Sequence, residues 1–120
     1  MNLNEITRPN IRNLNAYSSA RSLTMQKDVI LLDANENPFS ENGRYPDPNQ
    51  TELRMELSRY YDIQASSIMP GNGSDELIDL LFRAFTEPGK SNVILPEPTY
   101  GMYEVAANVQ NCLVKKVLLN

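Results

Sequence analysis

The stretch that decides the fold is GNGSDELIDLLFRAFTEPGKSNVIL, residues 71–95. It opens with a turn that holds two glycines, and apolar residues then recur at helical spacing over residues 77–85. A Pro-Gly pair ends this helix, and residues 92–95, an asparagine followed by three apolar residues, are typical of a buried strand. The stretch therefore predicts a turn, a helix whose apolar face includes Leu81 in the core, and a strand, as found in α/β domains.

The segments on either side of this stretch continue the alternation. Before it, Asn49 and Glu52 resemble a capping box that opens a helix. The apolar face of that helix consists of Leu53, Leu57, Tyr60 and Tyr61. After it, we expect a stiff turn at residues 96–98, a helix over 100–111 and a strand over 113–119. This order indicates an α/β fold with parallel strands joined by crossovers.

The mostly parallel sheet predicted in this way is incomplete. Parallel strands are normally buried on both faces by helices. A strand at the end of a 120-residue chain would need further strands and helices to cover it. We therefore expect the chain to be a fragment, or the first third, of a larger protein.

The first 48 residues differ from the rest of the chain. They begin with an Asn-rich segment of little periodicity, and the apolar run 29–32 is a candidate strand. Pro46 and Pro48 exclude a regular helix or a central strand at their positions. We predict an extended N-terminal arm over residues 1–48, of a kind that often reaches another subunit or rims a pocket, followed by the α/β domain over residues 49–120.

Composition excludes several classes of function. The chain carries 11 Lys and Arg against 15 Asp and Glu, the opposite of the basic surface of a nucleic-acid-binding protein. It has no histidine and one cysteine, Cys112, which argues against His-dependent catalysis, internal disulfides and a metal site. No apolar run approaches the roughly 20 residues that cross a bilayer, and the N-terminus does not resemble a secretory signal. We therefore expect a cytoplasmic protein with neither membrane nor nucleic-acid partners.

The turn over residues 71–76 is the first candidate site. Its glycines allow a close approach of a ligand, and the helix that follows presents free N–H groups and a partial positive charge. This arrangement suits a phosphate, to which the Ser74 hydroxyl can also donate. The alternative is a glycine-rich turn before a helix whose first-turn acids, Asp75 and Glu76, only complement the helix dipole. No Lys of a Walker loop follows the turn.

Three further segments carry candidate residues. Tyr100 follows the strand 92–95, at the sheet edge where α/β folds bind ligands, and can either stack on a flat ring or only cover the edge. The arm holds DANENP at residues 33–38 and RYPD at residues 44–47, which can rim a pocket or form a solvated loop. Near the start, Tyr17 and Arg21 place a phenol close to a cation, a pair that says little alone.

These segments, in this order and spacing, resemble the histidinol-phosphate aminotransferase family. The motifs that carry the resemblance are LDANENP from Leu32, RYPD from Arg44, GNGSDE from Gly71 and EPTYGMY from Glu97. The resemblance extends from about Arg12 to the end of the chain. It implies the N-terminal part of the large domain of the aspartate-aminotransferase fold, which is fold type I of the enzymes that use pyridoxal 5'-phosphate.

The resemblance also implies roles for individual residues. Gly73, Ser74 and Asp75 would form a cup of backbone N–H groups for the cofactor phosphate, and Tyr100 would stack on the pyridine ring. The residues implied on the arm are Tyr45, which would reach the phosphate in a partner subunit's site, and Tyr17 and Asn37, which would lie near the substrate. The implied assembly is a homodimer with composite active sites, in which the arm over residues 1–48 makes small-domain and dimer contacts.

No catalytic residue is expected within these 120 residues. The family's Schiff-base lysine, its Asp for the pyridinium nitrogen and its Arg residues lie further along the chain. The lysines present here, none of them in the family's lysine context, are Lys27, Lys90, Lys115 and Lys116. This segment alone is therefore expected to be inactive, because amino transfer needs that amine.

The resemblance implies that the full enzyme interconverts histidinol phosphate plus 2-oxoglutarate with imidazole-acetol phosphate plus glutamate. Threonine-phosphate decarboxylase or another class I/II aminotransferase is the alternative within the same fold. Glu36 favours the aminotransferase, because the decarboxylase more often has an apolar residue there. A non-catalytic phosphate-binding or dimerisation module is the alternative from a different class.

Overall fold

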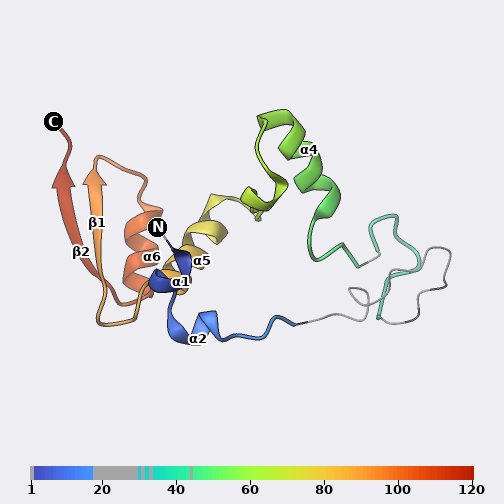
Figure 1. The fold of residues 1–120 in the computed structure, drawn as a ribbon, viewed down its shortest axis with the longest axis horizontal. Helices are drawn as coiled ribbons and strands as arrows, with labels where there is room; N and C mark the ends of the chain where they lie inside the picture. The colour runs from blue at the N-terminus through green and yellow to red at the C-terminus, as the bar shows by residue number, and fades with distance from the viewer. Residues whose placement is uncertain (1, 18–29, 31, 33, 44) are drawn as a thin grey trace. The chain divides into compact units, whose positions relative to one another are not determined.

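The computed structural model describes residues 2–17, 30, 32, 34–43 and 45–120 (Figure 1). The chain forms two compact units, one made of Met1–Asn15 with Gly71–Asn120 and the other of Ala16–Pro70. These units do not coincide with the predicted boundary after residue 48, since the first residues of the arm belong to the α/β unit. Each unit is therefore described by itself.

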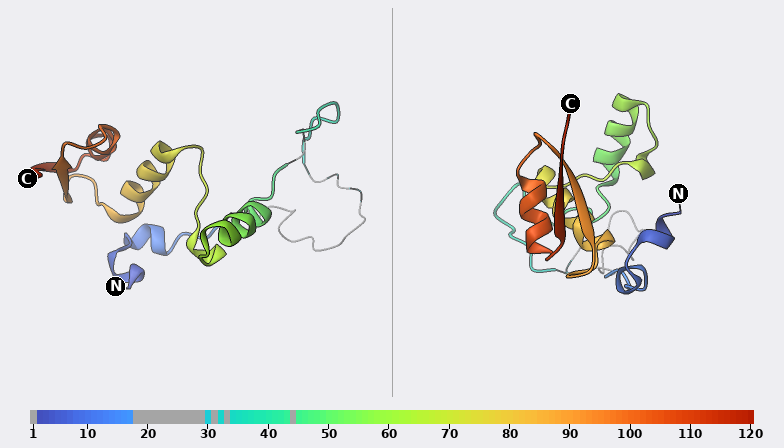
Figure 2. Two further views of the ribbon diagram at one scale, coloured as in Figure 1. Left: turned by 90° about the horizontal axis from the view of Figure 1, so that it is seen from above. Right: turned by 90° about the vertical axis from the view of Figure 1, so that its left-hand side faces the viewer.

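The α/β unit confirms the predicted alternation. Its elements are α5 (Ser74–Phe85), β1 (Asn92–Glu97), α6 (Met102–Val109) and β2 (Leu113–Leu118). The strands pair in parallel, with Asn92 opposite Leu113 at one end and Glu97 opposite Leu118 at the other. The connecting helix α6 runs alongside the two strands, as expected for a βαβ unit (Figure 2).

The core of this unit is small and lies where α6 packs against α5 and the two strands. Its buried apolar residues are Ile78, Leu95, Ala106, Ala107 and Cys112. Ala107 is completely buried, and two successive alanines allow α6 to approach the strands closely. The buried amide of Gln110 donates from Nε2 to the Thr86 carbonyl oxygen at 3.2 Å, which satisfies its polar group and links the ends of α6 and α5.

Two expectations about this core are wrong. Leu81 is 51% exposed, and the buried residue of α5 is Ile78 instead. The strand 92–95 is not buried on both faces: Leu95 is covered, whereas Ile94 is 68% exposed. In the two-stranded sheet α6 covers one face only, so alternate side chains remain open.

The predicted turn at 96–98 also begins later, since Pro96 and Glu97 still belong to β1.

The first residues are not extended as predicted. They form two short helices, α1 (Leu3–Ile6) and α2 (Pro9–Arg12). Arg8 joins them to the end of α5: its backbone N–H donates to the Ala84 carbonyl at 3.0 Å, and its guanidinium donates to the Arg83 carbonyl at 2.9 Å and pairs with Glu87 at 3.2 Å. These bonds supply partners for carbonyl groups that the last turn of a helix leaves unpaired.

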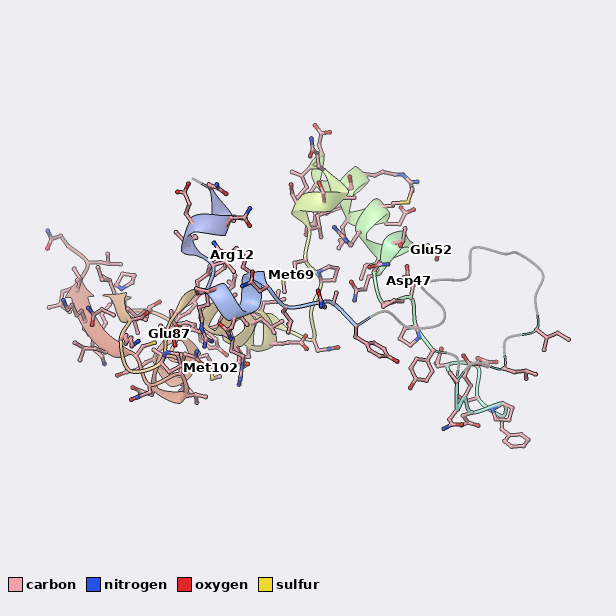
Figure 3. The ribbon with its side chains drawn as sticks, turned by 60° about the horizontal axis from the view of Figure 1, so that its bottom comes forward. Arg12, Asp47, Glu52, Met69, Glu87 and Met102 are labelled. Carbon is pink, nitrogen blue, oxygen red and sulfur yellow. The ribbon has the colours of Figure 1, made fainter. Side chains whose placement is uncertain are left out.

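The other unit contains α4 (Thr51–Tyr61) and the 3₁₀ turn η1 (Ala65–Ser67). The predicted capping box of Asn49 and Glu52 is wrong. Instead the Asp47 carboxylate accepts from the backbone N–H groups of Asn49 at 2.9 Å and Thr51 at 2.8 Å, and the bonds to Thr51 and Asn49 lower the pKa of Asp47. Figure 3 shows Asp47 at the amino end of α4 beside Glu52.

The apolar face predicted for α4 contains no buried residue, and Tyr60 is 81% exposed. Of the candidate strand at 29–32, residues 29 and 31 lie outside the described residues, and Ile30 and Leu32 are in no strand. Within the part of the chain that the structure describes, no helix is long and apolar enough to cross a bilayer.

Candidate functional site

The amino end of α5 is exposed. Gly73, the residue before the helix, has φ +88° and ψ 168°, a combination that is essentially confined to glycine. A Cβ at this position would meet no atom within 4 Å, so the space around it is free. The turn is held from the other side, where the Glu76 carboxylate accepts from the Asn72 backbone N–H at 2.5 Å and from its side-chain amide at 3.2 Å.

No side chain caps α5 at Gly73, and the following Ser74 and Asp75 are exposed. The first backbone N–H groups of a helix have no partner within the helix and carry part of its positive dipole. This end of α5 therefore has the donors and the sign of potential that a phosphate group needs.

Tyr100 joins this helix end to the edge of the sheet. Its hydroxyl donates to the Asp75 carboxylate at 3.2 Å, although 25 positions separate the two residues. Its ring contacts Tyr103 edge to face, with the centroids 6.1 Å apart, and the residue remains 54% exposed. The structure thus brings together two of the residues that the sequence predicts for the site, and it directs the Asp75 side chain towards Tyr100.

A cavity of about 420 Å³ lies beyond the carboxyl ends of the strands. Its lining consists of Leu95, Glu97, Pro98, Thr99, Tyr100, Gly101, Glu104 and Leu118. This is the edge at which open α/β sheets bind their ligands. Tyr100 belongs both to this lining and to the Asp75 contact, so it lies between the cavity and the α5 amino end.

Two carboxylates of the cavity share one cation that the sequence reasoning did not single out. The Lys116 ammonium lies 3.0 Å from a Glu97 oxygen and 2.9 Å from a Glu104 oxygen. The bonds to Glu104 and Glu97 raise the pKa of Lys116. An amine held protonated in this way is a poor nucleophile, which argues against a Schiff-base role for Lys116. Side chains alternate between the two faces of a strand. Leu95 and Glu97 therefore share one face of the sheet with Lys116 and Leu118, the residues opposite them in β2. This alternation is the sequence signal for the cluster.

The bond between Asp75 and Tyr100 predicts an altered titration of the phenol. Donation to the carboxylate, together with its negative charge, raises the pKa of Tyr100 above the usual value of about 10. The contribution of this hydrogen bond to the stability of the folded protein is therefore complete below about pH 10 and is lost as pH rises through the raised pKa. Asp75→Asn should move the pKa of Tyr100 back towards the usual value.

The titration is measured by phenolate absorbance, as the difference between each protein and the same protein with Tyr100→Phe. The difference isolates Tyr100 from the other tyrosines. A pKa of Tyr100 that stays the same when Asp75→Asn is introduced would contradict the bond.

The predicted residues of the arm lie in the other unit. Asn37 opens a loop closed by its own N–H, which donates to the Gly43 carbonyl at 3.2 Å. The Asn37 side-chain oxygen accepts from the Phe39 N–H at 3.0 Å, so this oxygen is engaged within the loop. Tyr45 follows this loop and is 59% exposed, and Tyr17 is 93% exposed. Arg21 lies outside the described residues.

Sequence reasoning missed the contact that links the two arm motifs. The Glu36 carboxylate accepts from the Tyr45 backbone N–H at 2.9 Å. The spacing of nine residues, with turn-forming residues between, is the only sequence signal for it. Across the described ranges, no group of three or more His, Cys, Asp or Glu side chains is placed to hold a metal ion.

The chain is similar to curated proteins named histidinol-phosphate aminotransferase. It is 50% identical over 99% of its length to the protein of Christiangramia forsetii and 52% identical over 98% to that of Bacteroides fragilis. It is 46% identical over 91% of its length to the protein of Cytophaga hutchinsonii. The chain spans about a third of the length of these relatives, 35%, 35% and 33% respectively.

The family model described as aminotransferase class I and II matches residues 13–120. The matched region contains both the α5 amino end and Tyr100, as well as the whole of β1, α6 and β2. It also contains the arm motifs with Asn37 and Tyr45. The chain therefore belongs to the aminotransferase class I and II family.

Proposed function

We propose that the complete protein is a pyridoxal-phosphate-dependent histidinol-phosphate aminotransferase. The reaction interconverts histidinol phosphate plus 2-oxoglutarate with imidazole-acetol phosphate plus glutamate, in the cytoplasm. Relatives of that name share about half of their aligned residues with almost the whole chain. The observation that supports the proposal is the Tyr100–Asp75 hydrogen bond, since it joins the helix end proposed for the phosphate to an aromatic ring at the sheet edge.

The residues present fit pyridoxal phosphate. The N–H groups at the start of α5, around Gly73, Ser74 and Asp75, would hold the phosphate, and the exposed ring of Tyr100 would lie against the pyridine. When bound, the cofactor supplies an electron sink for chemistry at the amino-bearing carbon.

The remaining roles in the proposal belong to binding and orientation. In a homodimer, Tyr45 would contact the cofactor phosphate held by the partner subunit, and Tyr17 and Asn37 would lie near the small-molecule substrate. The Asn37 side-chain oxygen is used within the loop, so its amide hydrogens support a donor role towards a phosphorylated or carboxylate-bearing substrate. We assign no catalytic residue to these 120 residues, and the raised pKa of Lys116 argues against that lysine as the Schiff-base amine.

Purified complete protein loaded with pyridoxal phosphate tests the proposal. We expect glutamate to form from 2-oxoglutarate when histidinol phosphate is the amino donor, at a kcat/KM at least about a hundredfold above that for aspartate or phenylalanine. Tyr100→Ala removes the ring assigned to the pyridine, so it should bind the cofactor less tightly and serves as the site control.

Other products would give other answers. Release of CO₂ from threonine phosphate without amino transfer would assign the decarboxylase instead. Equal rates with all donors would assign a general class I/II aminotransferase. A protein that binds no pyridoxal phosphate would favour the non-catalytic phosphate-binding or dimerisation module.

A further inference from the structure

The segment that carries Asn37 and Tyr45 is closed by backbone bonds. The Asn37 N–H donates to the Gly43 carbonyl at 3.2 Å, and the Gly43 N–H donates to the Ser40 carbonyl at 3.1 Å. A Cβ at Gly43 would lie 2.0 Å from the Asn37 carbonyl oxygen, so only glycine fits there. The loop 37–43 is therefore tightly closed, and the chain leaves it next to the point at which it entered.

Glu36 lies at this entry point. Its carboxylate accepts the Tyr45 backbone N–H at 2.9 Å, two residues after the loop ends. Glu36 is half-buried, in contrast to the exposed Glu41 at the loop tip. After Tyr45, the Asp47 carboxylate binds the backbone N–H groups at the start of α4. Tyr45 is thus placed between two backbone segments that carboxylates hold.

We propose that Glu36 is a positioning residue that fixes Tyr45 relative to Asn37 by binding the Tyr45 backbone N–H. This inference rests on the proposed function, in which Tyr45 binds a cofactor phosphate and Asn37 lies near the substrate. Glu36 touches neither ligand. A carboxylate that accepts a backbone N–H makes a stronger bond than a neutral acceptor, so its loss releases Tyr45 from the loop.

The measurement is the dissociation constant of pyridoxal phosphate from the complete apoprotein, by equilibrium dialysis. Removal of the acceptor in Glu36→Ala should weaken binding about threefold to tenfold, since the charge-assisted bond to the Tyr45 N–H is lost. Glu36→Gln keeps an acceptor oxygen and should stay within about twofold of the unaltered protein. Glu41→Ala is the matched control for charge on the same loop and should also stay within about twofold.

A double-substituted protein shows whether Glu36 acts through Tyr45. If it does, Glu36→Ala combined with Tyr45→Phe should bind the cofactor about as weakly as Tyr45→Phe alone. Two independent losses that add would overturn the positioning role. So would unchanged binding by Glu36→Ala alongside weakened binding by Tyr45→Phe, and this result would leave the proposed function standing. Unchanged binding by Tyr45→Phe would overturn both the Tyr45 assignment and the inference.

Discussion

Gly73→Ala is expected to weaken pyridoxal phosphate binding by the complete protein about tenfold to a hundredfold. The reason is the backbone and not a clash: φ +88° with ψ 168° is strained for any residue with a Cβ, although the added atom would meet nothing within 4 Å. Relief of that strain turns the peptide before α5, and the N–H groups of Ser74 and Asp75 then leave the phosphate. Binding is measured by dialysis of the apoprotein.

Two comparison variants separate strain from other causes. Ser74→Ala removes one hydroxyl and keeps the backbone, so a loss of only about threefold is expected. Gly101→Ala adds a Cβ where φ is −61° and nothing lies within 4 Å, so the urea midpoint of the apoprotein should not fall. Cofactor binding by Gly73→Ala as tight as that of the unaltered protein would show that the phosphate is not held at this turn.

Ile78→Ala is expected to destabilise the complete protein by about 2–5 kcal/mol. Ile78 is the buried residue of α5 and is 9% exposed, so its truncation leaves a cavity in a core whose other members include Leu95 and Ala107. The change in free energy follows from the midpoint and slope of urea-induced unfolding.

Ile78→Val is the graded control, because it removes one methylene and should cost about 0.5–1.5 kcal/mol. A truncation to alanine that cost no more than the valine substitution would mean that α5 does not bury this residue. Apolar spacing alone ranks Leu81→Ala equal to Ile78→Ala. The Leu81 side chain is half-exposed, however, whereas that of Ile78 is buried.

The order of elements in the α/β unit could be predicted from the sequence because it depends on local patterns. Apolar spacing indicated the extent of α5, and a Pro-Gly pair separated it from β1. The parallel pairing of β1 and β2 followed from the helix between them. These features need no knowledge of which side chains touch.

Burial and capping could not be predicted in the same way. Both Ile78 and Leu81 fit the apolar stripe, and only the position of α6 decides which is covered. At α4, Asp47 reaches past Asn49 to the Thr51 N–H, and two acceptors so close in sequence cannot be ranked from spacing alone. Such choices depend on tertiary geometry.

The candidate site shows the same division. The glycine turn and Tyr100 were predicted as separate features, and the contact between Tyr100 and Asp75 depends on where the loop after β1 turns. The cluster of Lys116 with Glu97 and Glu104 joins three elements, so no single motif contains it. The bond of Glu36 to Tyr45 likewise spans a loop that closes only in three dimensions.

The central claim is that the amino end of α5 and Tyr100 together hold the coenzyme. A crystal structure of the complete protein soaked with pyridoxal phosphate tests it most directly. The account predicts phosphate oxygens within about 3 Å of the Ser74 and Asp75 backbone nitrogens, with the Tyr100 ring against the pyridine. Electron density for the phosphate on another part of the protein, with the α5 amino end in contact with solvent alone, would contradict it.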